Sequence, residues 1–134
     1  KTPSVIGQWA LESFAHGVTP GTLVPVYDSA CPNILRYRYS ILVDDYSLDS
    51  SQFNNYNEER VVNSGIGWNP ETCQASGPGG PATDSVYITQ SSGSYVVENN
   101  TLVYTLNGGG SASYGFQFLT FDRIRVGENV YIRR

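Results

Sequence analysis

The sequence predicts an all-β protein whose single domain folds as an antiparallel up-and-down barrel of about eight strands. Two observations predict this fold class. Apolar and polar residues alternate along several segments, and turn-forming Gly, Pro and Asn residues separate these segments at short intervals. With 134 residues the chain can build one substantial core but not two, so we expect one barrel domain over residues 1–134.

The first predicted strand spans residues 5–11 and places Val5, Gly7, Trp9 and Leu11 on one face. A loop broken by several Gly and Pro residues is expected over residues 15–33. The clearest strand of the chain follows, because apolar and aromatic residues alternate there with arginines. Its apolar face comprises Leu35, Tyr37, Tyr39, Ile41 and Val43.

The middle of the chain has a weaker pattern. Residues 44–57 are ambiguous, because Phe53 and Tyr56 lie one helical turn apart while the Asn, Ser and Asp content disfavours a long helix. Residues 60–68 are predicted to form another strand. Residues 69–85 are the longest stretch with few apolar residues, and we expect a functional or mobile loop there.

The last third of the chain has the pattern of successive hairpins. Short strands are predicted at residues 86–90, 94–98, 101–106, 113–121 and 130–133, with turns between them. Asn99-Asn100-Thr101 fits a glycosylation sequon, but Asn-Asn is also a natural hairpin turn, which is the interpretation that we favour.

Two cysteines, Cys31 and Cys73, are predicted to form a disulfide. A zinc site would need further ligands, and His16 is the only histidine. The bond would close a long loop and stabilise the fold by on the order of 4 kcal/mol. It places the protein outside the cytosol. The chain does not begin with Met, which fits a removed leader and an extracellular, periplasmic or outer-surface location.

Composition restricts the partners. Charged residues make up only 15% of the chain, so uncharged polar residues must cover much of the surface. The formal net charge of -4 disfavours nucleic acid and anionic membranes, both of which attract basic proteins. No apolar stretch is long enough for a transmembrane segment.

The opening run Ile6-Gly7-Gln8-Trp9-Ala10-Leu11 resembles the Gly-x-Trp motif of the lipocalin and calycin barrels. The whole layout is similar to the short bacterial lipocalin-like domains of secreted proteins and lipoproteins, including the run from Gly93 to Leu102 and the ending Tyr131-Ile132-Arg133. The resemblance implies that Trp9 plugs one end of the barrel under an arginine from the last strands. Among the candidates Arg123, Arg125 and Arg133, we expect Arg123.

No catalytic, metal or cofactor motif is present, so we predict a protein that is not an enzyme and that carries no cofactor. Asp44, Asp45 and Asp49 lack the spacing of an EF-hand, and no serine has the Gly-x-Ser-x-Gly context of a nucleophile. A small-barrel cyclase that only shapes its substrate is compatible with the same sequence, because such catalysis leaves no motif.

The resemblance favours a secreted protein that binds a small hydrophobic or amphipathic molecule in its lumen, with residues 69–85 as a gate. The expected lumen residues are Tyr37, Tyr39, Ile41, Tyr95, Leu102, Tyr104, Tyr114, Phe116 and Phe118. One alternative is an extracellular structural protein that self-associates by donating its first strand to a neighbour. Another is a carbohydrate-binding module in which Trp68 or exposed tyrosines stack on sugars.

Overall fold

The computed structural model describes residues 3–134, and these residues form strands, turns and loops without a helix. They divide into two compact units. The first, here called the barrel unit, comprises the chain up to Pro20 together with Val43–Asn57 and Ile88–Arg134. The second, here called the disulfide unit, comprises Gly21–Leu42 and Glu58–Tyr87. The predicted all-β class is confirmed.

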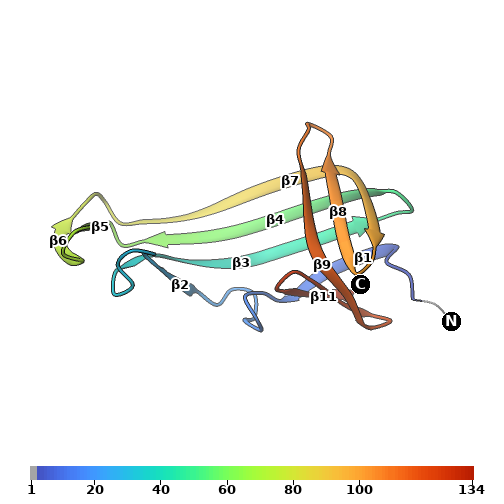
Figure 1. Ribbon diagram of the computed structural model, residues 1–134, viewed down its shortest axis with the longest axis horizontal. Helices are drawn as coiled ribbons and strands as arrows, with labels where there is room; N and C mark the ends of the chain where they lie inside the picture. Colours follow the sequence, from blue (N-terminus) through green and yellow to red (C-terminus); the bar gives the residue numbers. More distant parts are fainter. Residues whose placement is uncertain (1–2) are drawn as a thin grey trace. The chain divides into compact units, whose positions relative to one another are not determined.

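The barrel unit contains a closed antiparallel barrel of eight strands (Figure 1). Neighbouring strands follow the order β1-β11-β10-β9-β8-β7-β4-β3, and β1 also pairs with β3, which closes the ring. The predicted up-and-down barrel is therefore confirmed. The strands that take part are β1 (Gly7–Ser13), β3 (Leu35–Leu48), β4 (Gln52–Asn63), β7 (Thr83–Glu98), β8 (Thr101–Leu106), β9 (Ser111–Thr120), β10 (Arg123–Val126) and β11 (Asn129–Arg133).

Short hairpins connect β7 to β8, β8 to β9 and β10 to β11, as the sequence predicts, whereas residues 86–90 and 94–98, predicted as two strands, both belong to the single strand β7. Asn99 and Asn100 have φ angles of 53° and 60°, and this left-handed pair turns the chain between Glu98 and Thr101, which face each other. Asn tolerates this region better than most residues with a side chain, and two such residues in succession match the twist of the flanking strands. The turn interpretation of Asn99-Asn100 is confirmed.

The ambiguous residues 44–57 form the hairpin between β3 and β4. Asp49 closes it, because its Oδ1 accepts hydrogen bonds from the backbone N–H groups of Ser51 and Gln52 at 2.9 and 2.6 Å. Phe53 then points into the barrel core and is only 3% exposed. The spacing of Phe53 and Tyr56 does not reflect a helical turn, because both lie on β4.

The core fills much of the barrel. Trp9 is fully buried, and aromatic rings from several strands pack around it and one another. Inward-facing residues alternate with outward-facing ones along each strand, as a pleated sheet requires. The buried members of this cluster are Trp9, Leu48, Phe53, Tyr95, Leu102, Tyr104, Phe116, Ile124, Val126 and Tyr131.

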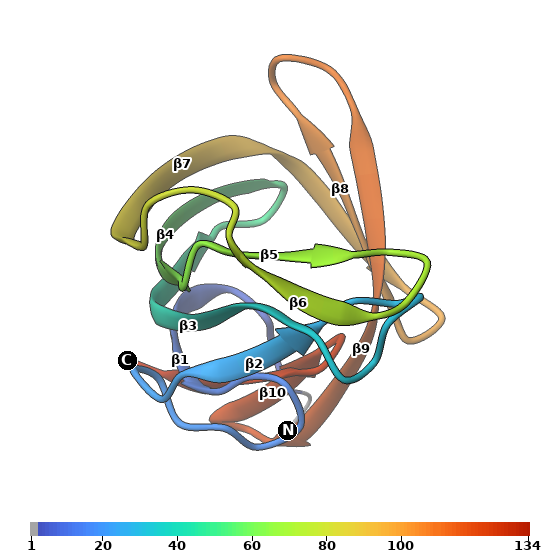
Figure 2. The same cartoon turned by 90° about the vertical axis from the view of Figure 1, so that its left-hand side faces the viewer.

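In the disulfide unit, β2 (Val24–Tyr27) pairs with β3, and β5 (Ile66–Asn69) pairs with β6 (Gln74–Pro78), as Figure 2 shows. The predicted disulfide is confirmed, with Cys31 and Cys73 joined at a Cα–Cα distance of 5.2 Å.

The prediction that residues 69–85 form a loop is wrong, because β6 and the start of β7 lie there. Gly67 pairs with Gly77, and the backbone of Gly79 lies so close to Gly67 that a Cβ at Gly79 would be 3.1 Å from the Cα of Gly67.

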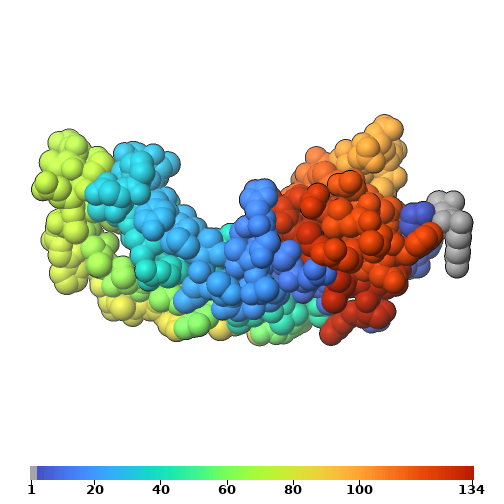
Figure 3. Space-filling view, turned by 90° about the horizontal axis from the view of Figure 1, so that it is seen from below, coloured from blue at the N-terminus to red at the C-terminus, as the bar shows by residue number. Residues whose placement is uncertain are grey.

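A loop of the barrel unit borders the C-terminal strands. In Figure 3 the blue segment that contains residues 15–20 lies beside the red end of the chain. His16 Nε2 is 3.2 Å from Glu128 Oε1, and both side chains are largely exposed. An exposed pair of this kind contributes little to stability.

Candidate functional site

One end of the barrel is closed by an arginine over Trp9, and that arginine is Arg133. The Cζ atom of Arg133 lies 4.3 Å from the centroid of the Trp9 ring. Its guanidinium donates hydrogen bonds to the backbone carbonyl oxygens of Ile6 at 2.7 Å, Ser4 at 2.6 Å and Phe121 at 3.0 Å. This end is therefore a clamp that joins the N-terminal strand to the last strands.

The structure places Arg123, the expected partner of Trp9, elsewhere. Arg123 faces Ile132 across the β10–β11 ladder. It forms a bidentate ion pair with Glu12, in which Nη2 of Arg123 lies 2.6 Å from Oε1 of Glu12. Arg133, in contrast, lies directly opposite Trp9 in the β1–β11 ladder. Residues that face each other in a ladder project to the same side of the sheet, so the register selects Arg133.

Gly7 explains the first position of the Gly-x-Trp motif. Its φ angle is +139°, and a Cβ atom placed there would lie 2.7 Å from Nη1 of Arg133. Glycine therefore provides both the backbone conformation and the space that the arginine needs.

A cavity of about 220 Å³, here called the aromatic cup, lies at the edge of the barrel core and is open to solvent, because Tyr114 and Leu106 in its wall are 47% and 40% exposed. The rings of Tyr46 and Tyr104 stack in parallel with centroids 6.0 Å apart, and Tyr114 meets Tyr104 edge-on at 5.8 Å. Polar groups lie between the rings. The residues that line the cup are Tyr46, Phe53, Asn55, Ser91, Tyr104, Leu106, Ser111, Ala112 and Tyr114.

A buried carboxylate lies behind this wall. Asp44 is 6% exposed and accepts hydrogen bonds from Asn55 Nδ2 at 2.7 Å and from the Tyr131 hydroxyl at 2.5 Å. Burial raises the pKa of Asp44, although the hydrogen bonds from Tyr131 and Asn55 oppose that effect. Desolvation also raises the pKa of Tyr46 and Tyr104, and the negative charge of Asp44 adds to both shifts. Tyr46 and Tyr104 therefore stay neutral and present hydroxyl donors.

The expected lumen residues separate into three groups. Tyr104 and Tyr114 line the cup. Others fill the barrel core or pack against it, and these are Tyr95, Leu102, Phe116 and Phe118. The remaining three lie on the part of β3 that belongs to the disulfide unit, and these are Tyr37, Tyr39 and Ile41. Sequence reasoning missed the cup residues Tyr46 and Asn55, as well as Asp44 behind them.

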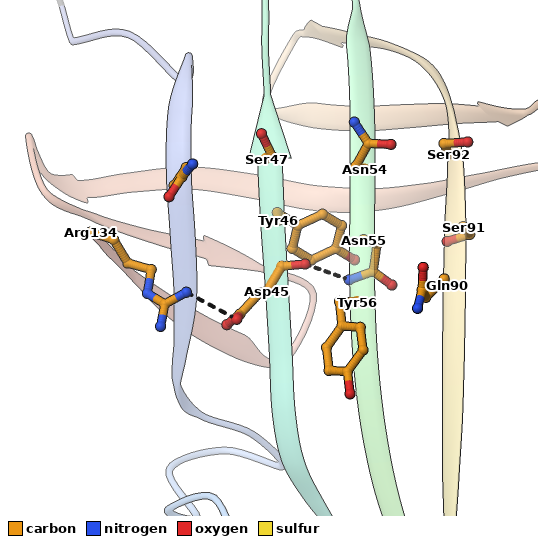
Figure 4. Close-up of a pocket in the computed structure, with 11 residues that line it drawn as sticks. Asp45, Tyr46, Ser47, Asn54, Asn55, Tyr56, Gln90, Ser91, Ser92 and Arg134 are labelled. Carbon is orange, nitrogen blue, oxygen red and sulfur yellow. Dashed lines mark hydrogen bonds and ion pairs between the residues drawn. The ribbon is translucent and has the colours of Figure 1, made fainter.

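The outer face of the barrel carries a second depression of about 320 Å³, here called the polar hollow (Figure 4). Figure 4 shows Ser47, Asn54 and Ser92 in one row across β3, β4 and β7, Tyr46, Asn55 and Ser91 in the next, and Asp45, Tyr56 and Gln90 in the row after that. Asp45 Oδ2 accepts a hydrogen bond from Arg134 Nη1 at 3.1 Å. Asp45 and Tyr46 are neighbours along β3 and project to opposite faces, but the hollow and the cup adjoin each other, because Tyr46, Asn55 and Ser91 line both.

The disulfide unit has a pocket of its own, of about 330 Å³. Tyr37, Arg36 and Trp68 line it together with the glycines of the β5–β6 hairpin and the residues that follow. Trp68 is half-buried there rather than fully exposed.

Within residues 3–134, no group of His, Cys, Asp and Glu side chains has the arrangement of a metal site, and no helix is long and apolar enough to span a membrane. No protein-family model, curated protein sequence or solved structure matches the chain significantly.

Proposed function

We propose that this protein binds a small amphipathic molecule in the aromatic cup. The observation that supports the proposal is a cavity walled by tyrosine and phenylalanine rings with Asn55 and Ser91 between them. Ligand sites are typically concave, mostly apolar and fitted with a few polar groups that orient the ligand. The rings would hold the apolar part of the ligand, while the amide and hydroxyl groups would pair with its polar part.

The volume of the cup indicates the size of the ligand. At about 220 Å³ it lies below the usual range for drug-sized molecules, roughly 300–1,000 Å³. Much of the remaining barrel interior is filled by the core. The ligand that we propose is therefore a molecule with one substituted ring rather than a long acyl chain.

The proposed setting is extracellular or periplasmic, and the proposed relationship is to lipocalin-like proteins. The Cys31–Cys73 disulfide supports the location, because such bonds persist in oxidising compartments. The closed barrel of eight antiparallel strands, with an arginine over the tryptophan of a Gly-x-Trp motif, supports the relationship.

The test is calorimetric titration with 2-phenylethanol as a neutral one-ring probe, followed by chemical-shift mapping by NMR. We expect binding that shifts the resonances of Tyr104, Tyr114 and Asn55. Ala112→Phe should abolish binding, because Ala112 lines the cup and the added ring would fill it. Ser113→Phe is the matched control, since the next residue of β9 projects to the other face. Absence of binding to the wild type, or equal binding by both variants, would refute the proposal.

A second candidate function is carbohydrate binding in the polar hollow. Tyr56 supplies a ring there, and Gln8, Asn54 and Gln90 supply amides that can pair with sugar hydroxyls. Titration with oligosaccharides, monitored by NMR, tests it. Binding that Tyr56→Ala weakens and Ala112→Phe leaves unchanged would support the polar hollow over the aromatic cup.

A further inference from the structure

Asp44 is a buried carboxyl group without a basic partner. None of the ion pairs found within residues 3–134 includes it, and the side chains hydrogen-bonded to it, Asn55, Asn57 and Tyr131, are all neutral. The residues that line the aromatic cup include no Lys, Arg or His. Removing a carboxylate from water is costly, and neutral hydrogen bonds offset only part of that cost. A positive charge held nearby would offset more of it.

The cup in front of Asp44 has the composition of a cation site. Its walls include Tyr46, Tyr104 and Tyr114, whose ring contacts bring three aromatic side chains together around one cavity. The face of an aromatic ring carries partial negative charge and attracts ammonium groups, most strongly where water is displaced. Rings that enclose a cavity are a known way of binding organic cations.

Asn55 links the carboxylate to the cavity. Its Nδ2 donates to Asp44 Oδ1 at 2.7 Å and to the backbone oxygen of Asp45 at 3.1 Å. With both hydrogens of the amide engaged, its oxygen is the atom left to accept a donor from a ligand. Figure 4 shows this oxygen turned away from Asp45, on the side of Ser91, which also lines the cup. The amide dipole thus extends the negative potential of Asp44 towards the cavity.

We propose that the ligand of the aromatic cup is a small organic cation, an aromatic or alkyl amine whose ammonium group lies against Asn55 and the tyrosine rings above Asp44. This inference rests on the function proposed above and specifies the chemical class of the ligand. Asp44 does not touch the ligand directly. It acts through Asn55 and through its charge.

The test compares three probes of similar size that differ in charge: phenethylamine, 2-phenylethanol and phenylacetate. We expect phenethylamine to bind about tenfold or more tightly than 2-phenylethanol, and phenylacetate to bind more weakly than either. Asp44→Asn should reduce this preference for the amine to within about twofold. Asp45→Asn is the matched control, because the same change on the opposite face of β3 should preserve the preference.

The outcomes separate this inference from the proposed function. Equal binding of the amine and the alcohol by the wild type would overturn the cation proposal and leave the cup as a neutral binding site. Failure of all three probes to bind would overturn both. If Asp44→Asn does not fold, the carboxyl 13C resonance of Asp44 in the wild type replaces it. A shift with phenethylamine but not with 2-phenylethanol supports the proposal, and equal shifts refute it.

Discussion

Replacing Arg133 by alanine should destabilise the barrel more than any other single change of an arginine that is described here. Arg133 closes the end of the barrel by covering Trp9 and by bonding to backbone carbonyls on both sides of it. Its side chain is 26% exposed, so water cannot fully replace these contacts. The alanine variant loses the ring contact and leaves the carbonyls of Ser4, Ile6 and Phe121 without their donor.

The magnitude follows from those contacts. A hydrogen bond to a charged group contributes about 1.5–3 kcal/mol when buried, and we take about 1 kcal/mol for each of the three because Arg133 is partly exposed. The cation–π contact adds about 1 kcal/mol. The expected loss is therefore about 3–4 kcal/mol, which for a chain of this length corresponds to a fall in Tm of roughly 10 °C or more.

Urea denaturation followed by Trp9 fluorescence measures the effect, and Arg123→Ala is the matched control. Arg123 forms an exposed ion pair with Glu12, so its removal should cost less than about 1 kcal/mol. Arg133→Lys should fall between the two, because lysine keeps the charge without the planar fork. If Arg133→Ala costs no more than Arg123→Ala, the clamp does not stabilise the barrel as argued here.

Three further changes test other parts of the structure. Gly7→Ala should destabilise the barrel by more than about 1 kcal/mol, which thermal unfolding measures. Alanine is strained at φ +139°, and its Cβ would collide with the Arg133 side chain. Replacing Cys31 and Cys73 together by serine should cost on the order of 4 kcal/mol, measured by denaturation beside the reduced wild type, which should match the variant. Burial raises the folded-state pKa of Asp44, so its contribution is fully present below about pH 4 and is lost as pH rises through that pKa. Asp44→Asn should therefore gain free energy of unfolding relative to the wild type between about pH 3 and pH 7, and a constant difference would contradict this.

The hairpins of the C-terminal third could be predicted because their signals are local. Asn99-Asn100 marks a turn by its own backbone preference, and the strands on either side alternate clearly. The hairpin of β5 and β6 could not be predicted in this way. Its glycines, Gly67 and Gly77 in the strands and Gly79 packed against Gly67, have no side chains, so they show no alternation and suggest a loop.

Three expected lumen residues of β3 lie in the disulfide unit, because this strand runs through both compact units. In its first half the apolar residues are Tyr37, Tyr39 and Ile41, which belong to the disulfide unit. In the barrel unit the inward-facing residues are those at even positions, Asp44 and Tyr46 among them. A strand that passes from one compact unit to another has a different set of buried positions in each unit. An alternation read from the clearest part of the strand therefore assigns the wrong face to the other part.

The Trp9–Arg133 contact can be predicted from a short part of the sequence, whereas the aromatic cup cannot. The contact of Trp9 with its covering arginine depends on one short motif and one strand pair. A resemblance over a few residues is therefore enough to predict Trp9. The choice among the three candidate arginines is decided by the β1–β11 register. The cup draws its walls from β3, β4, β7, β8 and β9, and no two of its tyrosines are near neighbours in sequence. Its most unusual member, Asp44, is a charged residue at an inward position of the barrel, where a hydrophobic side chain would stabilise the core more simply. The cation that we propose for the cup would offset part of that desolvation cost.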